Sequence, residues 1–541
     1  MPALSSLLPA LPQPAVARRA VGAALTLGVL TDALLRAQPL GINLLLLTTA
    51  LVAALAWLAR RREQPLTLGA ALLGALALVF AGAAGWRDAE ALAALNVLAL
   101  LTVLAALAAA VLHGDALDVD HAGPLAYVGG AVIMGARVAF GAPLLASRAV
   151  EAPPLPAPAT LAGIGTLARG GLLAAPALLV FGVLLVSADR AFARMMEHLV
   201  AWDGGLVAQH VVVITVSAWM VGGYLYAALL APRPAPIADA PATTLEHAIA
   251  PMSDLRAGLQ GVGVGVREVT VAIALVDALF LTFGALQVGW LFGGSRALAT
   301  AGVTVAEYAR RGFFELVVVA ALALPMLLLA HGLVGEGTPS PHSRRAHRHF
   351  RIAAGALIAL VLVLLVSAAD RMRLYLTAFG LTEQRFYASA FMAWLGVVFA
   401  WAGATLLRGR VAQFALGTLV SGWAWVLLLH AVNPDARIVN VNAVRAARGL
   451  DLDAEYLAGL SADAAPALVA HADTMLAATQ REPRARCQLQ WAFHHAARRA
   501  ERRGDWRGWS LSRARARHLL PAAWLTAPAP CTPAPVPPPA S

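Results

Sequence analysis

Long stretches of uncharged, apolar residues constrain this chain more than any other feature of its sequence. Residues 39–59, 66–85 and 91–112 contain no Asp, Glu or Arg. A helix of about 20 such residues crosses the ~30 Å hydrocarbon layer of a bilayer. Because 60% of the chain is hydrophobic and only 13% is charged, it has more apolar surface than a soluble core could bury. The sequence therefore predicts an all-α, polytopic bundle of transmembrane helices.

The same pattern recurs as far as residue 431 and predicts about 11 to 12 spans. The candidate spans are 20–36, 39–59, 66–85, 91–112, 172–188, 206–230, 269–292, 313–333, 352–369, 387–407 and 411–431, with 124–146 as a further candidate. This last stretch carries Arg137 at its centre and several glycines, so it fits either a span inside the bundle or a segment at the interface. Arginines in the short loops are nearly balanced between the two sides with eleven or twelve spans, so they leave the orientation open. We favour twelve spans.

Changes in composition divide the chain into five parts. They are an N-terminal segment 1–19, a first group of helices 20–146, a main bundle 147–431, a helical extramembrane tail 432–520 and a Pro/Ala-rich, disordered end 521–541. Asn433-Pro434-Asp435 marks the start of the tail, since Pro cannot continue a helix and Asp can cap a new one. We expect several short tail helices, packed through Leu457, Leu460, Leu468, Trp491, Phe493, Trp506 and Trp509.

The charged and cysteine residues narrow the class of ligand. The net charge of +11 comes from Arg alone, which favours anionic lipid headgroups, and no interleaved aromatic and basic pattern points to nucleic acid. Cys487 and Cys531 are too few and too isolated to suggest a disulfide framework or a thiolate metal site. No phosphate-binding glycine motif or metal-ligand spacing is present, so we expect no metal and no cofactor.

Several short motifs together resemble a known group of proteins. They are Ser187-Ala-Asp-Arg190, Val276-Asp277-Ala-Leu-Phe280, Leu291-Phe-Gly-Gly294, Glu307-Tyr-Ala-Arg-Arg-Gly-Phe-Phe-Glu315, Arg371-Met372, Leu374-Tyr375, Gly380-Leu-Thr382, Asn433-Pro-Asp435, Leu460-Ser-Ala-Asp463 and Asp505-Trp506. In order and number they resemble polytopic bacterial membrane proteins grouped as domains of unknown function 4153 and 4173. The resemblance implies a multi-pass protein of the bacterial inner membrane. It implies no catalytic residue, because the family has no established activity.

Asp277 is the acidic residue that lies deepest in a predicted span. Placing its charge against lipid would cost at least about 2.5 to 3.5 kcal/mol, so we expect the side chain to face protein or water. Gln287 lies ten residues further on, close to three helical turns, and would share its face. Asp277 is either a carboxylate that couples to protons or cations, or a structural residue that is protonated or paired with Arg.

A second candidate site is a group of charges at the ends of spans. Spans ending at 188, 292, 369 and 431 alternate with intervening spans, so their exits should lie on one membrane face. The cluster consists of Asp189, Arg190, Glu307, Arg310, Arg311, Glu315, Asp370, Arg371, Asn433 and Asp435. It would bind an anionic headgroup or substrate, or hold the tail in place; the structural alternative is ordinary interfacial ion pairs worth about 0.3 to 0.5 kcal/mol each.

Three functional classes remain open from the sequence. The first is a transporter that uses the polar site around Asp277, and the second is a membrane-anchored signalling or scaffold protein whose helical tail binds a protein partner. The third is a membrane-embedded enzyme that acts on lipid-linked substrates, for which no catalytic motif is present. A polar cavity that reaches Asp277 would favour transport, and an exposed groove on the tail would favour docking.

Overall fold

The computed structural model is helical throughout the part of the chain that it describes. The described residues are 13–62, 66–113, 124–149, 205–231, 266–300, 313–334, 341–480, 482–501 and 505–531. Nine helices within these ranges are long and apolar enough to cross a membrane. Large apolar side chains such as Leu275, Leu322 and Val366 are more than 60% exposed on the outside of the bundle, where lipid would cover them. The predicted class, a polytopic helical bundle with a helical tail, is confirmed.

The first group of helices packs around small and branched apolar residues. It contains α1 (Gln13–Leu35), α2 (Ile42–Arg61), α3 (Leu68–Ala83), α4 (Glu90–His113), α5 (Pro124–Ala149) and α8 (Gly205–Leu229). Leu58, Leu112, Leu225 and Leu229 are fully buried in this core. At Gly223 a Cβ atom would collide with the backbone of Val138, so glycine is what lets α5 and α8 approach closely.

The second group forms its own core, and α15 packs against both groups. It contains α10 (Val266–Thr300), α12 (Phe313–Val334), α13 (Pro341–Phe379), α14 (Glu383–Thr405) and α15 (Val411–Val432). Leu357, Val361 and Phe399 lie at its centre. Helix α15 packs against both α14 and α4, and Trp423 Nε1 donates a hydrogen bond of 2.9 Å to Thr102 Oγ1 of α4.

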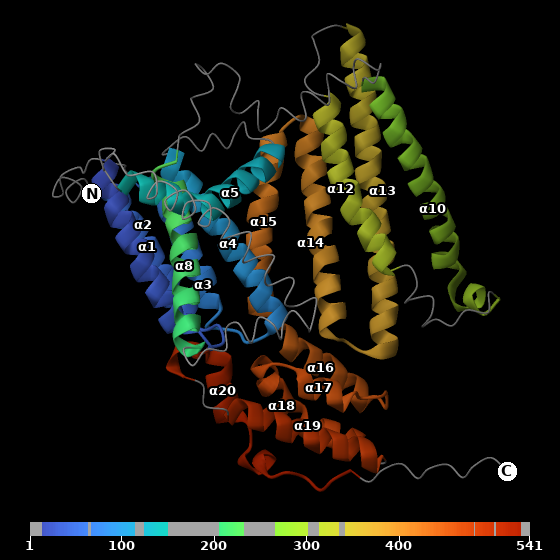
Figure 1. Cartoon of the computed structure of the whole chain (residues 1–541). Coiled ribbons are helices and arrows are strands. Elements are labelled where there is room, and N and C mark those ends of the chain that lie inside the picture. Colours follow the sequence, from blue (N-terminus) through green and yellow to red (C-terminus); the bar gives the residue numbers. More distant parts are fainter. Residues whose placement is uncertain are drawn as a thin grey trace.

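The tail lies against one end of the bundle (Figure 1). We call this end the tail face; it is where α1, α3, α13 and α15 end and where α2, α4 and α14 begin. We call the opposite end the far face. Helix α4 ends on the far face and α8 begins on the tail face. The choice between eleven and twelve spans depends on residues 114–123 and 150–204, which lie outside the described part of the chain. Residues 130–149 of α5 are long and apolar enough to span, and the candidate 172–188 lies outside the described residues.

The tail has its own small hydrophobic core. Its helices are α16 (Pro434–Ala447), α17 (Ala454–Gly459), α18 (Ala465–Ala478), α19 (Pro483–Glu501) and α20 (Leu511–Leu519), with short turns η3 (Ala462–Ala464), η4 (Trp506–Gly508) and η5 (Ala522–Leu525). Leu457, Leu460, Leu468 and Phe493 are buried together, as predicted, and Trp491 is half-buried.

The prediction that Trp506 and Trp509 pack in the tail core is wrong. They are 64% and 43% exposed and lie in a segment that contacts the ends of α1 and α2. The backbone N–H of Ile42 donates to the carbonyl oxygen of Trp509 at 3.0 Å. The two rings lie at the end of the bundle, and indole rings favour the boundary between lipid and water.

The segment after α20 corrects two further expectations. Cys487 and Cys531 form a disulfide, although their isolation in the sequence argued against one. Trp524 stacks on Phe493 with ring centroids 4.2 Å apart, and Trp491 Nε1 donates to the carbonyl oxygen of Ala529 at 3.3 Å. Residues 521–531 are therefore held against α19 rather than disordered; residues 532–541 lie outside the described part of the chain.

Candidate functional site

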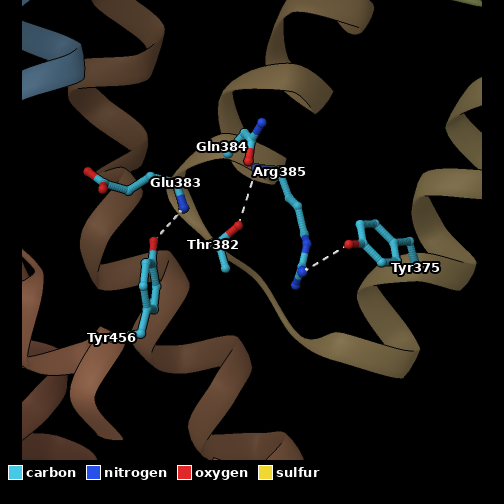
Figure 2. Close-up of a pocket in the computed structure, with 6 residues that line it drawn as sticks. All are labelled: Tyr375, Thr382, Glu383, Gln384, Arg385 and Tyr456. Carbon is cyan, nitrogen blue, oxygen red and sulfur yellow. Dashed lines mark hydrogen bonds between the residues drawn. The ribbon is translucent and has the colours of Figure 1, made fainter. Parts of the chain in front are cut away.

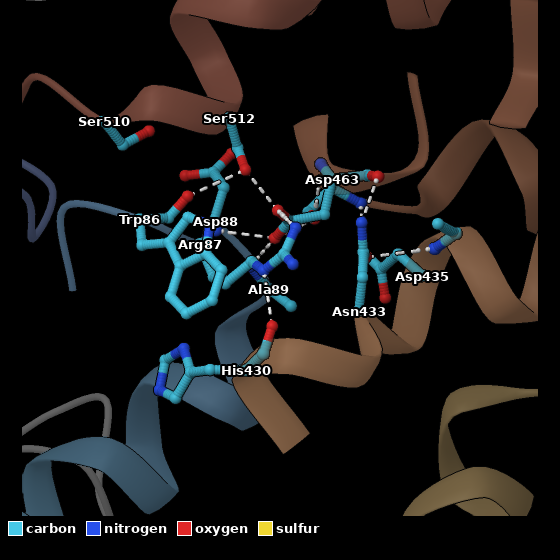
Figure 3. Close-up of polar contacts among 12 residues, drawn as sticks. Trp86, Arg87, Asp88, Ala89, His430, Asn433, Asp435, Asp463, Ser510 and Ser512 are labelled. Atoms are coloured by element: carbon cyan, nitrogen blue, oxygen red, sulfur yellow. Dashed lines mark hydrogen bonds and ion pairs between the residues drawn. The ribbon is translucent and has the colours of Figure 1, made fainter. Parts of the chain in front are cut away.

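The most extensive buried polar network among the described residues lies where the bundle meets the tail. We call it the bundle–tail joint (Figure 3), and its centre is Asp463 of η3, which is 1% exposed. One carboxylate oxygen of Asp463 accepts hydrogen bonds from the backbone N–H groups of Asp88 (2.6 Å) and Ala89 (3.0 Å) at the start of α4. A carboxylate at the first turn of a helix is favoured there by the exposed N–H groups and the helix dipole. The tail thus supplies the cap of a membrane helix.

The other oxygen of Asp463 faces two side chains from opposite ends of the chain. Arg87 approaches it at 3.5 Å, and the hydroxyl of Ser512 lies against it and against the carbonyl oxygen of Trp86. Arg87 Nε also donates to the carbonyl oxygen of His430 at 2.8 Å, at the end of α15. The loop between α3 and α4, the end of α15 and the tail are therefore tied to one carboxylate.

Two more carboxylates surround this centre. Asp435 is fully buried and accepts the backbone N–H of Ser461 at 2.9 Å. Asp88 forms an ion pair of 3.1 Å with Arg513. Burial raises the pKa of both carboxyl groups, and the N–H of Ser461 and the charge of Arg513 oppose this effect at Asp435 and Asp88, respectively. The joint therefore concentrates negative charge that arginines and N–H groups only partly compensate.

A second contact fixes α16 against the turn between α13 and α14. Gly380 has φ of +77°, and a Cβ at this position would collide with the side chain of Asn442. The amide group of Asn442 bonds both the N–H (3.0 Å) and the carbonyl oxygen (2.8 Å) of Leu381. Arg445 donates to the carbonyl oxygens at the end of α13, including that of Ala378 at 3.0 Å, and so caps the helix where its dipole favours a cation.

Beside this contact lies a pocket of about 350 Å³ at the seam between bundle and tail (Figure 2). Its lining residues are Tyr375, Thr382, Glu383, Gln384, Arg385 and Tyr456. The Arg385 guanidinium lies 4.3 Å from the Tyr375 ring centroid, and the N–H of Glu383 donates to the Tyr456 hydroxyl at 2.6 Å. Burial raises the pKa of Tyr456 to about 12, so its phenol stays neutral at physiological pH.

The structure places Asp277 on the inner face of α10. It is half-buried, between Ile273 and Phe280, which both pack into the core formed with α13. Its Oδ1 atom is buried without a hydrogen-bond partner among the described residues. This agrees with the expectation that Asp277 turns away from lipid. Helix α10 continues without a break through Gln287, whose side chain lies outside the described part.

The predicted charge cluster is divided by the structure. Asp370 and Arg371 lie near the end of α13, and Asn433 and Asp435 lie where α15 ends and α16 begins, so all four are at the tail face, in keeping with the expected common surface. Asn433 and Asp435 enter the joint, where the Asn433 amide donates to the carbonyl oxygen of Asp463 at 3.1 Å. Arg371 is instead buried within α13, with 7% exposure. Asp189, Arg190, Glu307, Arg310 and Arg311, and the side chain of Glu315, lie outside the described residues.

Comparison with protein families places this joint in context. A family model described as a domain of unknown function, DUF4153, matches residues 67–471. The chain belongs to this family. In this DUF4153 protein, the matched part includes Arg87, Asp435 and Asp463 but excludes Ser512 and Arg513. No curated protein and no solved structure matches the chain.

Sequence reasoning missed most of the joint as a site. The sequence analysis named Asp463 only within a short family-like motif, and it did not select Arg87, Asp88, Ser512 or Arg513. One signal was available: Arg87 and Asp88 lie together in the short loop between two predicted spans, where a charge pair must meet either water or another part of the protein.

Proposed function

We propose that this membrane protein is a docking protein, in which the bundle holds the tail in a fixed position and the tail binds a partner. The observation that carries this proposal is the burial of Asp463. A tail that was merely tethered would not need a carboxylate, 1% exposed, that binds N–H groups and side chains of the bundle. Such networks rigidify the elements that they join.

The outward surface of α19 supports a partner of opposite charge. Arg484, Arg486 and Arg498 are exposed on this helix, and its apolar residues Leu489 and Phe493 face the tail core. In Figure 1, α19 lies on the side of the tail away from the bundle. Clustered arginines attract acidic surfaces and steer association. The proposed partner is therefore a protein with an acidic patch.

Photo-crosslinking of the full chain in its membrane tests this proposal. A photoreactive residue replaces Gln490, which is exposed on α19, and a matched control replaces Arg410, which is exposed on the far face. We expect one defined protein adduct from position 490 and none of the same mass from position 410. The adduct should disappear when Arg484→Glu and Arg486→Glu are combined. An adduct that survives this charge reversal, or no protein adduct at position 490, contradicts the proposal.

Transport through the bundle is a second candidate, favoured by the Oδ1 atom of Asp277, which is buried and has no hydrogen-bond partner among the described residues. An intramembrane carboxylate in protein surroundings is suited to binding and releasing a proton or cation. If it does so, Asp277→Asn should abolish proton flux in proteoliposomes while the protein still inserts. Unchanged flux in the variant would remove the coupling role from Asp277.

A further inference from the structure

Arginine is distributed unequally between the two ends of the described bundle. The far face carries Arg18, Arg19, Arg60, Arg61, Arg62, Arg148, Arg267, Arg344, Arg345, Arg348, Arg351, Arg408 and Arg410. The tail face of the bundle carries Arg36, Arg87, Arg296, Arg371, Arg373 and Arg385. The far face thus has more than twice as many. The near balance found from the sequence covered the arginines of all short predicted loops, whereas this count covers the described residues alone.

This asymmetry bears on orientation, because short cytoplasmic loops of membrane proteins carry an excess of Arg and Lys. The rule applies to short loops and helix ends, whereas larger domains cross the membrane largely regardless of their charge. The tail, from Pro434 onward, is such a domain, so its own arginines do not count. By this rule the far face lies in the cytoplasm, and the tail face lies outside it.

The cysteines provide an independent observation. The chain has two, and both lie in the tail, where they form a disulfide with their Cα atoms 5.7 Å apart. Disulfides persist in oxidising compartments outside the cytoplasm and are rare within it. The bond links α19 to the segment that carries Trp524, the residue that stacks on Phe493. This pair of cysteines therefore fits a tail that folds and is oxidised outside the cytoplasm.

We propose that the tail is an extracytoplasmic domain and that Cys487 and Cys531 are oxidised there to a structural disulfide. The two thiols lose two protons and two electrons as the S–S bond forms. A protein disulfide of a thiol oxidase accepts them through a mixed disulfide and leaves as a dithiol. This inference is independent of the docking function, and it places any partner of the tail outside the cytoplasm.

Labelling of single cysteines in the full chain tests the orientation. In the C487S/C531S background, Thr474→Cys puts a thiol on the exposed surface of α18, and Arg345→Cys puts a matched thiol on the exposed far end of α13. Spheroplasts of a bacterial host are treated with a membrane-impermeant maleimide. We expect position 474 to react in intact spheroplasts and position 345 to react only after permeabilisation. The reverse pattern, or equal reaction of both before permeabilisation, overturns the proposal.

The state of the natural cysteines is tested without any substitution. Cells are quenched in acid, and the denatured chain is treated with a polyethylene glycol maleimide that adds a fixed mass to each free thiol. We expect no added mass before reduction and two additions after it, and two additions without reductant in a host that lacks its thiol oxidase. Two additions without reductant in the normal host would overturn the oxidised pair. This measurement decides the matter even if C487S/C531S fails to fold.

Discussion

Removal of the Asp463 carboxylate should open the bundle–tail joint. Asp463→Ala leaves the N–H groups of Asp88 and Ala89 without their acceptor and removes one of the two acceptors of the Arg87 guanidinium. Breaking a buried charged network by removing one partner typically costs about 3 to 5 kcal/mol. Since about 1.4 kcal/mol corresponds to a factor of ten, the open state of the joint should become about 10² to 10⁴ times more populated.

Hydrogen exchange at the start of α4 measures this opening directly. The amides of Asp88 and Ala89 bond to Asp463, so their exchange in nanodiscs reports opening of the joint. We expect their exchange to accelerate by the stated factor in Asp463→Ala, and by less in Asp463→Asn, which keeps one acceptor oxygen. The matched control Asp473→Ala removes an exposed acid from α18 and should shift the opening free energy by under about 0.5 kcal/mol. Unchanged exchange at Asp88 and Ala89 in a folded Asp463→Ala protein would refute this reasoning.

Three further predictions concern the tail and its contacts. Because burial raises the pKa of Asp435, its contribution to stability is fully present below the ordinary value of 3.8 and is lost as the pH rises through the raised pKa. Asp435→Asn should therefore gain stability relative to the natural chain as the pH rises above 3.8; a pH series of thermal unfolding measures this, and parallel curves would contradict it. Gly380 and Gly409 both have left-handed backbone conformations, so replacing either by Ala should cost about 1 to 2 kcal/mol in strain. Gly380→Ala should cost more than Gly409→Ala, because the new Cβ would collide with a neighbouring side chain only at position 380. Equal melting temperatures of the two variants would show that the collision is relieved. Replacing both Cys487 and Cys531 by Ser should lower the free energy of unfolding of the tail by up to about 4 kcal/mol. This value follows from the chain-entropy model for a closed loop with a sequence separation of 44 residues. Hydrogen exchange of the α19 amides would measure the loss of stability.

The helices were predictable because each span is specified locally. A segment that crosses lipid must satisfy its own backbone groups and present apolar side chains, so its length and composition suffice to find it. The start of α16 was equally local, although its cap is Asn433 and not Asp435 as predicted: the Asn433 side chain accepts from the N–H of Ala436 at 3.2 Å, and Pro434 occupies the first turn. The face shared by α13 and α15 followed from alternation of spans alone.

The joint was not predictable because its members are far apart in the sequence. Arg87 and Asp463 are separated by 376 residues, and no periodic pattern connects a loop charge with a distant acid. Trp506 and Trp509 show a second limit. Spacing of aromatic residues does not distinguish side chains of a protein core from exposed ones, and these two residues are exposed at the end of the bundle.

The contacts of residues 505–513 have a consequence for how the protein is made. Arg513 donates to the carbonyl oxygen of Leu40 at 2.9 Å, and Leu511 donates its N–H to the carbonyl oxygen of Gly85 at 2.7 Å. These loops are translated well before residues 505–513, which bind them. The helices beside the loops can insert in order, but the loops stay without these contacts until residues 505–513 have been made. A protease that surveys new membrane proteins could therefore distinguish chains that carry the tail from chains that lack it by access to these two loops.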